Sequence, residues 1–233
     1  MTTVSDYDDG AEAKWSAEAT GRMNRMYRWQ RYIYDATRRY YLLGRDELID
    51  AIKPSNGASV LEIGCGTGRN LVHAANKYPG ARFYGIDVST EMLTTAIAAI
   101  ARRGFDGRVR VAHGDATAFD PAALFGIPAF DRVMISYSLS MIADWHAVLD
   151  NAVSHLKPGG QLHIVDFGNQ ERLPAVARSV LLRWLTLFDV TPRRDMQDVL
   201  MTMASDAGAH LAFAKPFRGY AQSAVLTRPT RPG

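Results

Sequence analysis

The chain has 233 residues and a formal net charge of +3, from 27 basic and 24 acidic side chains. With 47% hydrophobic and 22% charged residues it can bury one substantial core, which excludes a globally disordered chain. Its apolar stretches are too short or too interrupted to span a bilayer, and its acidic start is unlike a secretory signal. The single cysteine, Cys65, excludes an internal disulfide and a cysteine-based zinc cluster, so no metal site is expected. We therefore expect a reduced, cytoplasmic protein.

Positive charge is concentrated near the N-terminus, in residues 21–45, here called the basic segment. It carries +6 from seven arginines and one acid, whereas the other 208 residues carry −3. Three tyrosines recur every seven residues, and three arginines each follow a tyrosine by four positions. On one continuous helix these six side chains would fall within an arc of about 80°, opposite an apolar face, and Gly44 would end the helix. The six residues are Tyr27, Arg31, Tyr34, Arg38, Tyr41 and Arg45.

Three interpretations of the basic segment remain open. It is a solvated charged face, a Tyr/Arg stripe that closes over a cofactor and an acceptor, or a nucleic-acid arm. Basic residues are sparse in the rest of the chain and the segment lacks lysine, so no nucleic-acid partner is expected.

From residue 58 onward, short β-like runs alternate with helix-like stretches, which favours βαβ units and a parallel sheet. We expect strands at 59–63, 82–86, 109–112, 132–136 and 161–166, followed by two closing strands near 209–215 and 219–226. Helices are expected near 70–77, 91–102, 145–155, 175–188 and 196–207.

A glycine-rich loop follows the first expected strand, with glycines at 64, 66 and 68 directly after Glu62-Ile63. Glycines there let the backbone turn tightly and bring its N–H groups close to a ligand. The dinucleotide fingerprint would need glycine at position 69, where Arg69 stands, and no P-loop lysine follows. The pattern E-x-G-x-G-x-G resembles the cofactor loop of class I S-adenosylmethionine-dependent methyltransferases.

Later residues strengthen this resemblance. Asp87 ends the second expected strand, 25 residues after Glu62, where a carboxylate can accept both ribose hydroxyls of a nucleoside. Asp115 ends the third, where the class I enzymes use an acid for the adenine amino group. Ser136-Tyr137-Ser138 leaves the fourth, and Leu156-Lys157-Pro158-Gly159-Gly160 precedes the fifth, as in this family. We expect Cys65 to be a small buried residue beside the loop.

The resemblance implies an α/β, Rossmann-like class I methyltransferase fold. Its mostly parallel seven-stranded sheet would carry helices on both faces, with an N-terminal helical cap at residues 1–50 and the cofactor-binding domain at 51–233. The implied cofactor is S-adenosyl-L-methionine, and the product is S-adenosyl-L-homocysteine. The expected cofactor-binding residues are Tyr27, Arg38, Tyr41, Arg45, Glu62, Gly64, Cys65, Gly66, Asn70, Asp87, Val88, Ser89, Met92, Asp115, Ala116 and Ser136.

A closer resemblance lies in the stretches YIYDATRRYYLLGRD, at residues 32–46, and VLEIGCGTGRNL, at residues 60–71. Together they look like the bacterial betaine-lipid (diacylglycerylhomoserine) N-methyltransferases. That family implies three successive methylations of the homoserine amine, at a catalytic site lined by Tyr137. The expected substrate-binding residues are Arg31, Tyr32, Tyr137 and Arg218.

A lipid acceptor implies peripheral contact with the inner face of an anionic membrane, through arginines and aromatic residues of the basic segment. The main alternative is a class I methyltransferase acting on another acceptor, such as phosphatidylethanolamine or a quinone precursor. A non-catalytic cofactor-binding or RNA-associated protein on the same fold is a further alternative, because fold does not fix function.

Overall fold

The computed structural model describes residues 42–172, 174–186 and 190–230. The chain divides into two compact units, residues 1–42 and 43–233, and the account below concerns the second. None of its described helices is both long and apolar enough to cross a bilayer.

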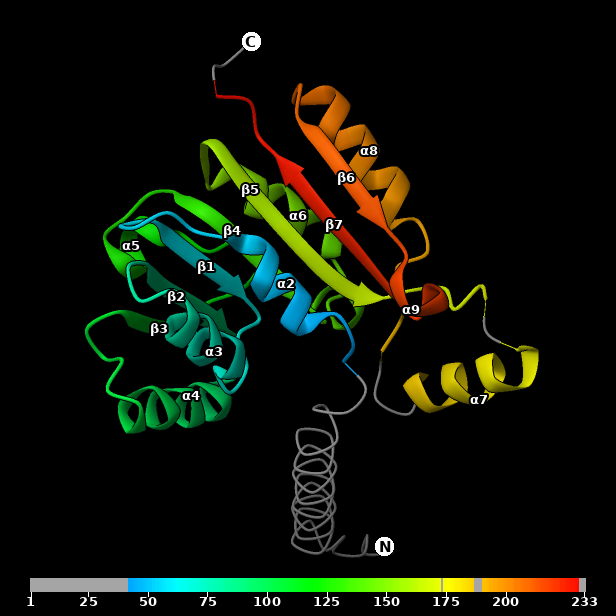
Figure 1. Cartoon of the computed structure of the whole chain (residues 1–233), viewed down its shortest axis with the longest axis horizontal. Coiled ribbons are helices and arrows are strands. Elements are labelled where there is room, and N and C mark those ends of the chain that lie inside the picture. Colours follow the sequence, from blue (N-terminus) through cyan, green and yellow to red (C-terminus); the bar gives the residue numbers. More distant parts are fainter. Residues whose placement is uncertain (1–41, 173, 187–189, 231–233) are drawn as a thin grey trace, which may run out of the picture. The chain divides into compact units, whose positions relative to one another are not determined.

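The second unit is built on one seven-stranded sheet in the order β3-β2-β1-β4-β5-β7-β6 (Figure 1). The first five strands along the chain pair in parallel, whereas β7 pairs antiparallel with both β5 and β6. The expected mostly parallel sheet is therefore confirmed. Its strands are β1 (Ser59–Ile63), β2 (Arg82–Asp87), β3 (Val109–His113), β4 (Phe130–Ser136), β5 (Leu156–Phe167), β6 (His210–Ala214) and β7 (Ala221–Thr227).

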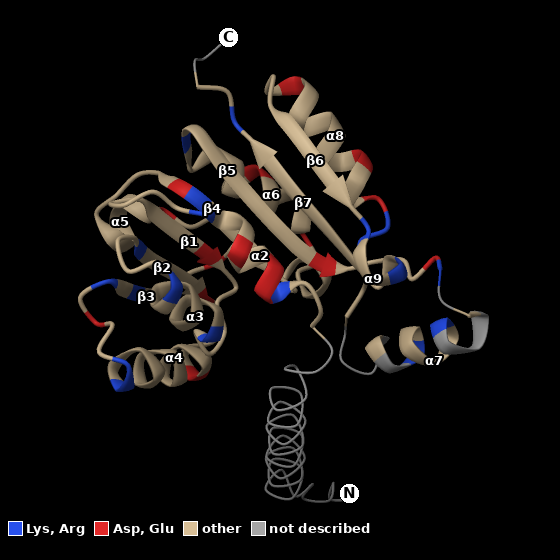
Figure 2. Ribbon diagram, in the orientation of Figure 1, with Lys and Arg blue, Asp and Glu red and all other residues tan. Residues whose placement is uncertain are grey.

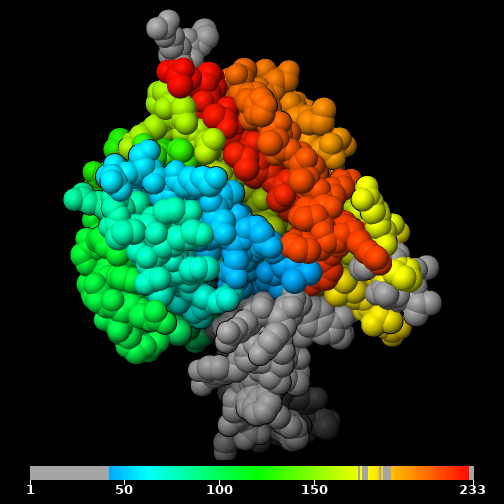
Figure 3. Space-filling model, viewed as in Figure 1, coloured from blue at the N-terminus to red at the C-terminus, as the bar shows by residue number. Residues whose placement is uncertain are grey.

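Helices cover both faces of this sheet, as expected for parallel strands that are apolar on both sides. In Figure 1, α2 and α3 lie across the near face and α6 lies behind the sheet. Figure 3 shows the same side, where α2 covers the middle of the sheet and contacts β4 and β5. The helices are α2 (Arg45–Ile52), α3 (Arg69–Lys77), α4 (Thr90–Arg102), α5 (Pro121–Phe125), α6 (Trp145–Ser154), α7 (Ala175–Thr186), α8 (Met196–Asp206), α9 (Pro216–Gly219) and the 3-10 helix η1 (Leu139–Met141).

The largest apolar cluster lies on the face that α5, α6 and α8 cover. It joins alternate strand residues such as Leu61 and Ile63 to Trp145 of α6 and Leu200 of α8, all of them buried. The period-two alternation of the strands sends the side chain of Glu62 to the opposite face, toward α3.

The amino ends of three strands are tied together by one carboxylate, that of Asp131. Its Oδ2 accepts from the backbone N–H and the hydroxyl of Ser59, both at 2.8 Å, and from the Lys157 Nζ at 2.7 Å. These contacts lower the pKa of Asp131 against the opposing effect of its partial burial. The beginnings of β1, β4 and β5 are therefore fixed relative to one another.

Several details differ from the sequence prediction. Gly44, with φ 90°, precedes a separate helix that begins at Arg45, so the expectation of one continuous helix carrying Arg31, Arg38 and Arg45 was wrong. Residues 156–160 belong to β5, although they were expected to precede it, because Leu156 pairs with Phe130 before a register shift. The short helices α2, α5, α9 and η1 were not predicted.

Candidate functional site

The glycine-rich loop joins β1 to α3 at the carboxyl edge of the sheet. Gly64, Gly66 and Gly68 have φ values of 70°, 53° and 73°, which L side chains rarely adopt. The N–H groups of Gly64 and Cys65 both donate to the Ile86 carbonyl of β2 at 2.9 Å. The loop is thereby folded back over the end of β2.

The loop also packs closely against the segment that follows β4. A Cβ added at Gly64 would lie 2.5 Å from the Ser138 Oγ, so only glycine fits there without a shift. Cys65 is buried, with its Sγ 2.8 Å from where a Cβ at Gly85 would stand. Burial, reinforced by Glu62 and Asp87, raises the pKa of its thiol, which suits a packing role.

Three buried polar side chains, joined by hydrogen bonds, support the glycine-rich loop. The Asn70 Nδ2 donates to the Glu62 Oε1 at 2.7 Å, and the Arg45 Nε donates to the Asn70 Oδ1 at 3.2 Å. These hydrogen bonds link α2, α3 and β1. Figure 2 shows acidic residues at the arrowheads of β1 and β5, where Glu62 and Asp166 are the next-to-last residues.

Asp87, at the end of β2, faces the glycine-rich loop. Its Oδ2 accepts from the Gly66 N–H at 2.8 Å and its Oδ1 from the Ser89 N–H at 2.9 Å. Ser89 caps α4 by accepting from the Met92 N–H. Val88 is 71% exposed beside this carboxylate. A carboxylate that can accept from ribose hydroxyls, next to an exposed apolar side chain that can contact a base, fits an adenosine group.

Asp115 follows β3 at the same edge and is exposed. Its Oδ1 accepts from the Thr117 N–H at 2.8 Å and the Thr117 hydroxyl at 2.7 Å. These bonds lower the pKa of Asp115 and keep the carboxylate charged. The carbonyl of the neighbouring Ala116 accepts from Asn151 of α6 at 3.1 Å.

Tyr137 follows β4 in a left-handed conformation, with φ 57°. Its side chain is buried, packs edge-on against Phe167 with ring centroids 4.7 Å apart, and donates its hydroxyl to the Leu43 carbonyl at 2.5 Å. Burial raises the pKa of the phenol, and nearby Asp166 raises it further. Ser136 is buried at the end of β4.

Asp166, the next-to-last residue of β5, is a buried carboxylate. Its Oδ2 accepts from the Ser140 N–H at 3.2 Å and its Oδ1 from the Phe167 N–H at 2.7 Å. Burial raises the pKa of Asp166, and the hydrogen bonds from Ser140 and Phe167 act in the opposite direction. It therefore anchors η1 to the end of β5.

Comparison with known proteins accounts for this geometry. The sequence model of a family described as a methyltransferase domain matches residues 61–162, which run from β1 into β5. The chain carries a class I S-adenosylmethionine-dependent methyltransferase domain.

Two curated relatives are named as methyltransferases. The methyltransferase domain is similar to nocamycin O-methyltransferase of Saccharothrix syringae, with 36% identity over 132 residues, 56% of this chain and 45% of that protein. It is also similar to demethylmenaquinone methyltransferase of Clavibacter sepedonicus, with 31% identity over 163 residues, 68% of this chain and 62% of that protein. The match thus spans less than two thirds of either relative.

The fold agrees with solved structures. An O-methyltransferase family protein from Burkholderia thailandensis superposes with a TM-score of 0.67 at 18% identity, covering 86% of this chain and 59% of that one. The expected Rossmann-like class I methyltransferase fold is therefore confirmed, and S-adenosylmethionine is the cofactor of the domain.

The described part of the methyltransferase domain brings the remaining expected cofactor residues together at one edge of the sheet. They come from the ends of β1, β2, β3 and β4 and the residues directly after them, and from the helices that follow β1 and β2. Arg45 comes from α2, which precedes β1. Their individual contacts with the cofactor stay predictions. Tyr27, Arg31, Tyr32, Arg38 and Tyr41 lie outside the described residues.

Arg218 lies in the turn between β6 and β7 with an exposed side chain and a φ of 58°. Its carbonyl accepts from the Arg172 N–H at 3.2 Å, so its backbone lies beside the loop that follows β5. Its role in binding the acceptor stays a prediction. Sequence reasoning missed Asp166 as an anchor, although an acid at the end of an apolar strand is the same pattern that identified Asp87.

Proposed function

We propose that this chain methylates the amine of diacylglyceryl-homoserine three times and so forms the trimethylated betaine lipid. Bound S-adenosylmethionine supplies an electrophilic methyl group. In each transfer an N–C bond forms, the S–C bond to the methyl group breaks and S-adenosylhomocysteine leaves. The new ammonium loses a proton to solvent before the next transfer, until the nitrogen is quaternary.

The observation that carries an amine acceptor is the state of Tyr137 and Asp166 at the carboxyl ends of β4 and β5. The Tyr137 phenol is bonded to the Leu43 carbonyl and its pKa is raised, so it stays protonated at neutral pH. The Asp166 carboxylate is buried and accepts from backbone N–H groups. An α-amino group has a pKa of about 8, so part of it is already neutral at cellular pH. Its methylation therefore requires correct positioning rather than a strong base.

The choice of a homoserine lipid rests on the sequence of residues 32–46, which resembles the betaine-lipid family. Arginines of the basic segment suit a carboxylate head group and an anionic leaflet. The acceptor would be reached by peripheral contact with the membrane.

The test is methyl transfer from labelled S-adenosylmethionine by the full chain to acceptors presented in vesicles. We expect one, two and three methyl groups on diacylglyceryl-homoserine, and faster transfer when the vesicles contain anionic lipid. Phosphatidylethanolamine, a demethylated menaquinone and RNA are the competing acceptors. Label in any of these but not in the homoserine lipid would overturn the proposal.

A matched pair of variants ties the activity to the site. Asp87→Asn weakens the expected ribose contact, whereas Asp144→Asn changes a carboxylate whose side chain caps α6 at the Ala147 N–H. Asparagine caps helices about as well as aspartate. We expect only the first variant to lose cofactor affinity.

A quinone precursor is the second candidate acceptor. It is favoured by the similarity to demethylmenaquinone methyltransferase, which extends over 68% of this chain. Transfer to the demethylated menaquinone in the same assay would select it.

A further inference from the structure

Gln170 has a fully buried side chain whose polar atoms have no hydrogen-bond partner among the described residues. It lies three residues after the end of β5 and is 0% exposed. Neither its Oε1 nor its Nε2 has a hydrogen-bond partner in the part of the chain that the structure describes. Buried amides in folded proteins are almost always paired, so a partner outside this unit's own described groups is implied.

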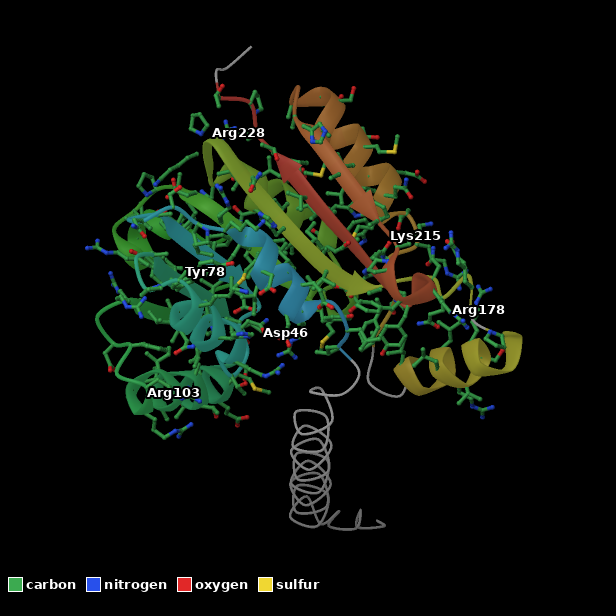
Figure 4. All side chains as sticks on the ribbon, viewed as in Figure 1. Asp46, Tyr78, Arg103, Arg178, Lys215 and Arg228 are labelled. Atoms are coloured by element: carbon green, nitrogen blue, oxygen red, sulfur yellow. The ribbon has the colours of Figure 1, made fainter. Side chains whose placement is uncertain are left out.

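The backbone around Gln170 is held firmly, so its side chain has a defined place. The Gln170 N–H donates to the Gly219 carbonyl at 2.8 Å, and the Gly168 N–H donates to the Tyr220 carbonyl at 2.8 Å. Lys215, which is labelled in Figure 4, donates from its Nζ to the Glu171 Oε1 at 2.9 Å. The loop after β5 therefore runs against the turn between β6 and β7.

Both of these segments are strained. Gln170 has a φ of 55°, and the turn contains three successive residues with positive φ: Phe217, Arg218 and Gly219. Non-glycine residues persist in this region only where the surroundings hold them there, and such positions concentrate at ligand sites.

The pair of segments lies at the functional edge of the sheet. The end of β5 is on the same edge as the ends of β1 and β4, from which the glycine-rich loop and Ser138 extend. Ligands of open α/β sheets bind outside these carboxyl ends.

We propose that the Gln170 carboxamide binds the amino-acid head group of the methyl acceptor. Its Nε2 donates to the acceptor carboxylate and its Oε1 accepts an N–H of the neutral amine, so one amide recognises both groups. This assignment rests on the proposed function and deepens it. It makes Gln170 a residue that selects an acceptor with a carboxylate beside its amine.

The contacts of Gln170 with the carboxylate and with the amine do not both persist through the three transfers. The primary and secondary amines each have an N–H for the Gln170 Oε1, but the tertiary amine has none. The third transfer therefore proceeds with the carboxylate contact alone.

The first measurement is the melting temperature. Replacing a buried amide that has hydrogen-bond partners should lower it, whereas replacing one that has none should not. Gln170→Met removes an amide that has no partner among the described residues, so we expect the unliganded chain to melt at the same temperature or a few degrees higher. Gln222→Met is the matched control, since the buried Gln222 Nε2 donates to the carbonyls of Phe167 and Arg193 at 3.0 and 2.8 Å. That variant should melt lower.

Kinetic measurements then distinguish acceptor binding from cofactor binding. For the unmethylated homoserine lipid, we expect Gln170→Met to lower kcat/KM about 10- to 100-fold, with S-adenosylmethionine affinity unchanged. The dimethylated lipid should lose less, because only the carboxylate contact is removed. Gln170→Glu should be slower than Gln170→Met on every carboxylate acceptor, because two like charges would face each other.

Three outcomes would overturn the assignment. They are an unchanged kcat/KM in Gln170→Met, an equal loss for unmethylated and dimethylated acceptors, and a melting temperature that falls as far as in Gln222→Met. A parent chain that methylates no homoserine lipid would instead overturn the proposed function, and the assignment with it.

Discussion

Single residues of the cofactor loop are fixed by what surrounds them as well as by their own backbone conformation. Gly64 and Gly104 share nearly the same φ, 70° and 67°. A Cβ at Gly104 would meet nothing within 4 Å, whereas one at Gly64 would meet the Ser138 side chain. Comparing alanine substitutions at the two positions therefore separates the effect of backbone strain from that of close packing.

We expect Gly104→Ala to lower the free energy of unfolding by about 1 kcal/mol through strain alone. Gly64→Ala should cost about 2–4 kcal/mol, because the strain is joined by overlap with Ser138. It should also weaken S-adenosylmethionine binding, because the displaced loop carries the Gly66 N–H that bonds Asp87. Urea unfolding and titration calorimetry measure both effects. Equal losses of stability in the two variants would contradict the role of close packing.

At the scale of an element, the short helix η1 is held from two sides. The Asp166 carboxylate accepts from the N–H of Ser140, the middle residue of η1. The Arg193 guanidinium donates to the carbonyls of Leu139 and Ile142, at 3.0 and 2.7 Å. The segment after β4 is thereby bound to the end of β5 and to the residues before α8.

We expect Asp166→Asn to destabilise the chain by about 1–3 kcal/mol, because an amide nitrogen would face backbone donors in a buried site. Hydrogen exchange of the Ser140 amide should become faster. Asp120→Asn is the control, since Asp120 is exposed and caps α5 through the Ala122 N–H. Unchanged exchange at Ser140 would show that Asp166 does not hold η1.

The elements were predictable where local chemistry decides them. The parallel strands are short and rich in β-branched and other apolar residues, and the expected strand at 59–63 coincides with β1. The glycine-rich loop was predictable because its positive φ values demand glycine. What the sequence could not supply depends on distant contacts: the Tyr137 phenol meets the Leu43 carbonyl 94 residues away. The isolation of the Gln170 amide likewise follows only from its folded surroundings.

For the molecule as a whole, the titration of His163 links stability to pH. His163 lies on β5 between β4 and β7 and is 2% exposed. Burial, with a smaller contribution from Arg132, lowers the pKa of its imidazole to about 4. In the unfolded chain the pKa is about 6.5, so between these values the unfolded state binds a proton that the native state does not.

The free energy of unfolding should therefore fall as the pH drops from 7 toward 4, and the contribution of His163 at pH 5 is about 2 kcal/mol. We expect His163→Gln to remove that part of the difference between urea unfolding at pH 7 and at pH 5. His146→Gln, at an exposed position on α6, is the matched control. A His163→Gln chain with the same pH dependence as the parent would contradict the assignment.

The fold also changes how the positive charge of the basic segment is divided between the two units of the chain. Arg45, counted with the basic segment, begins α2 and is buried beside Asn70. The described unit therefore contains one arginine of that segment, and the other six precede residue 43.

The Asp131 contacts with Ser59 and Lys157 fix the sheet at the edge opposite the cofactor loop. Residues that hold the strands in register and residues that meet ligands are thus separated by the length of the strands. Under the proposed function, substitutions in the loops after β4 and β5 alter acceptor binding and leave the Asp131 contacts intact. The proposed arrangement thus separates the residues under selection for acceptor binding from those under selection for stability.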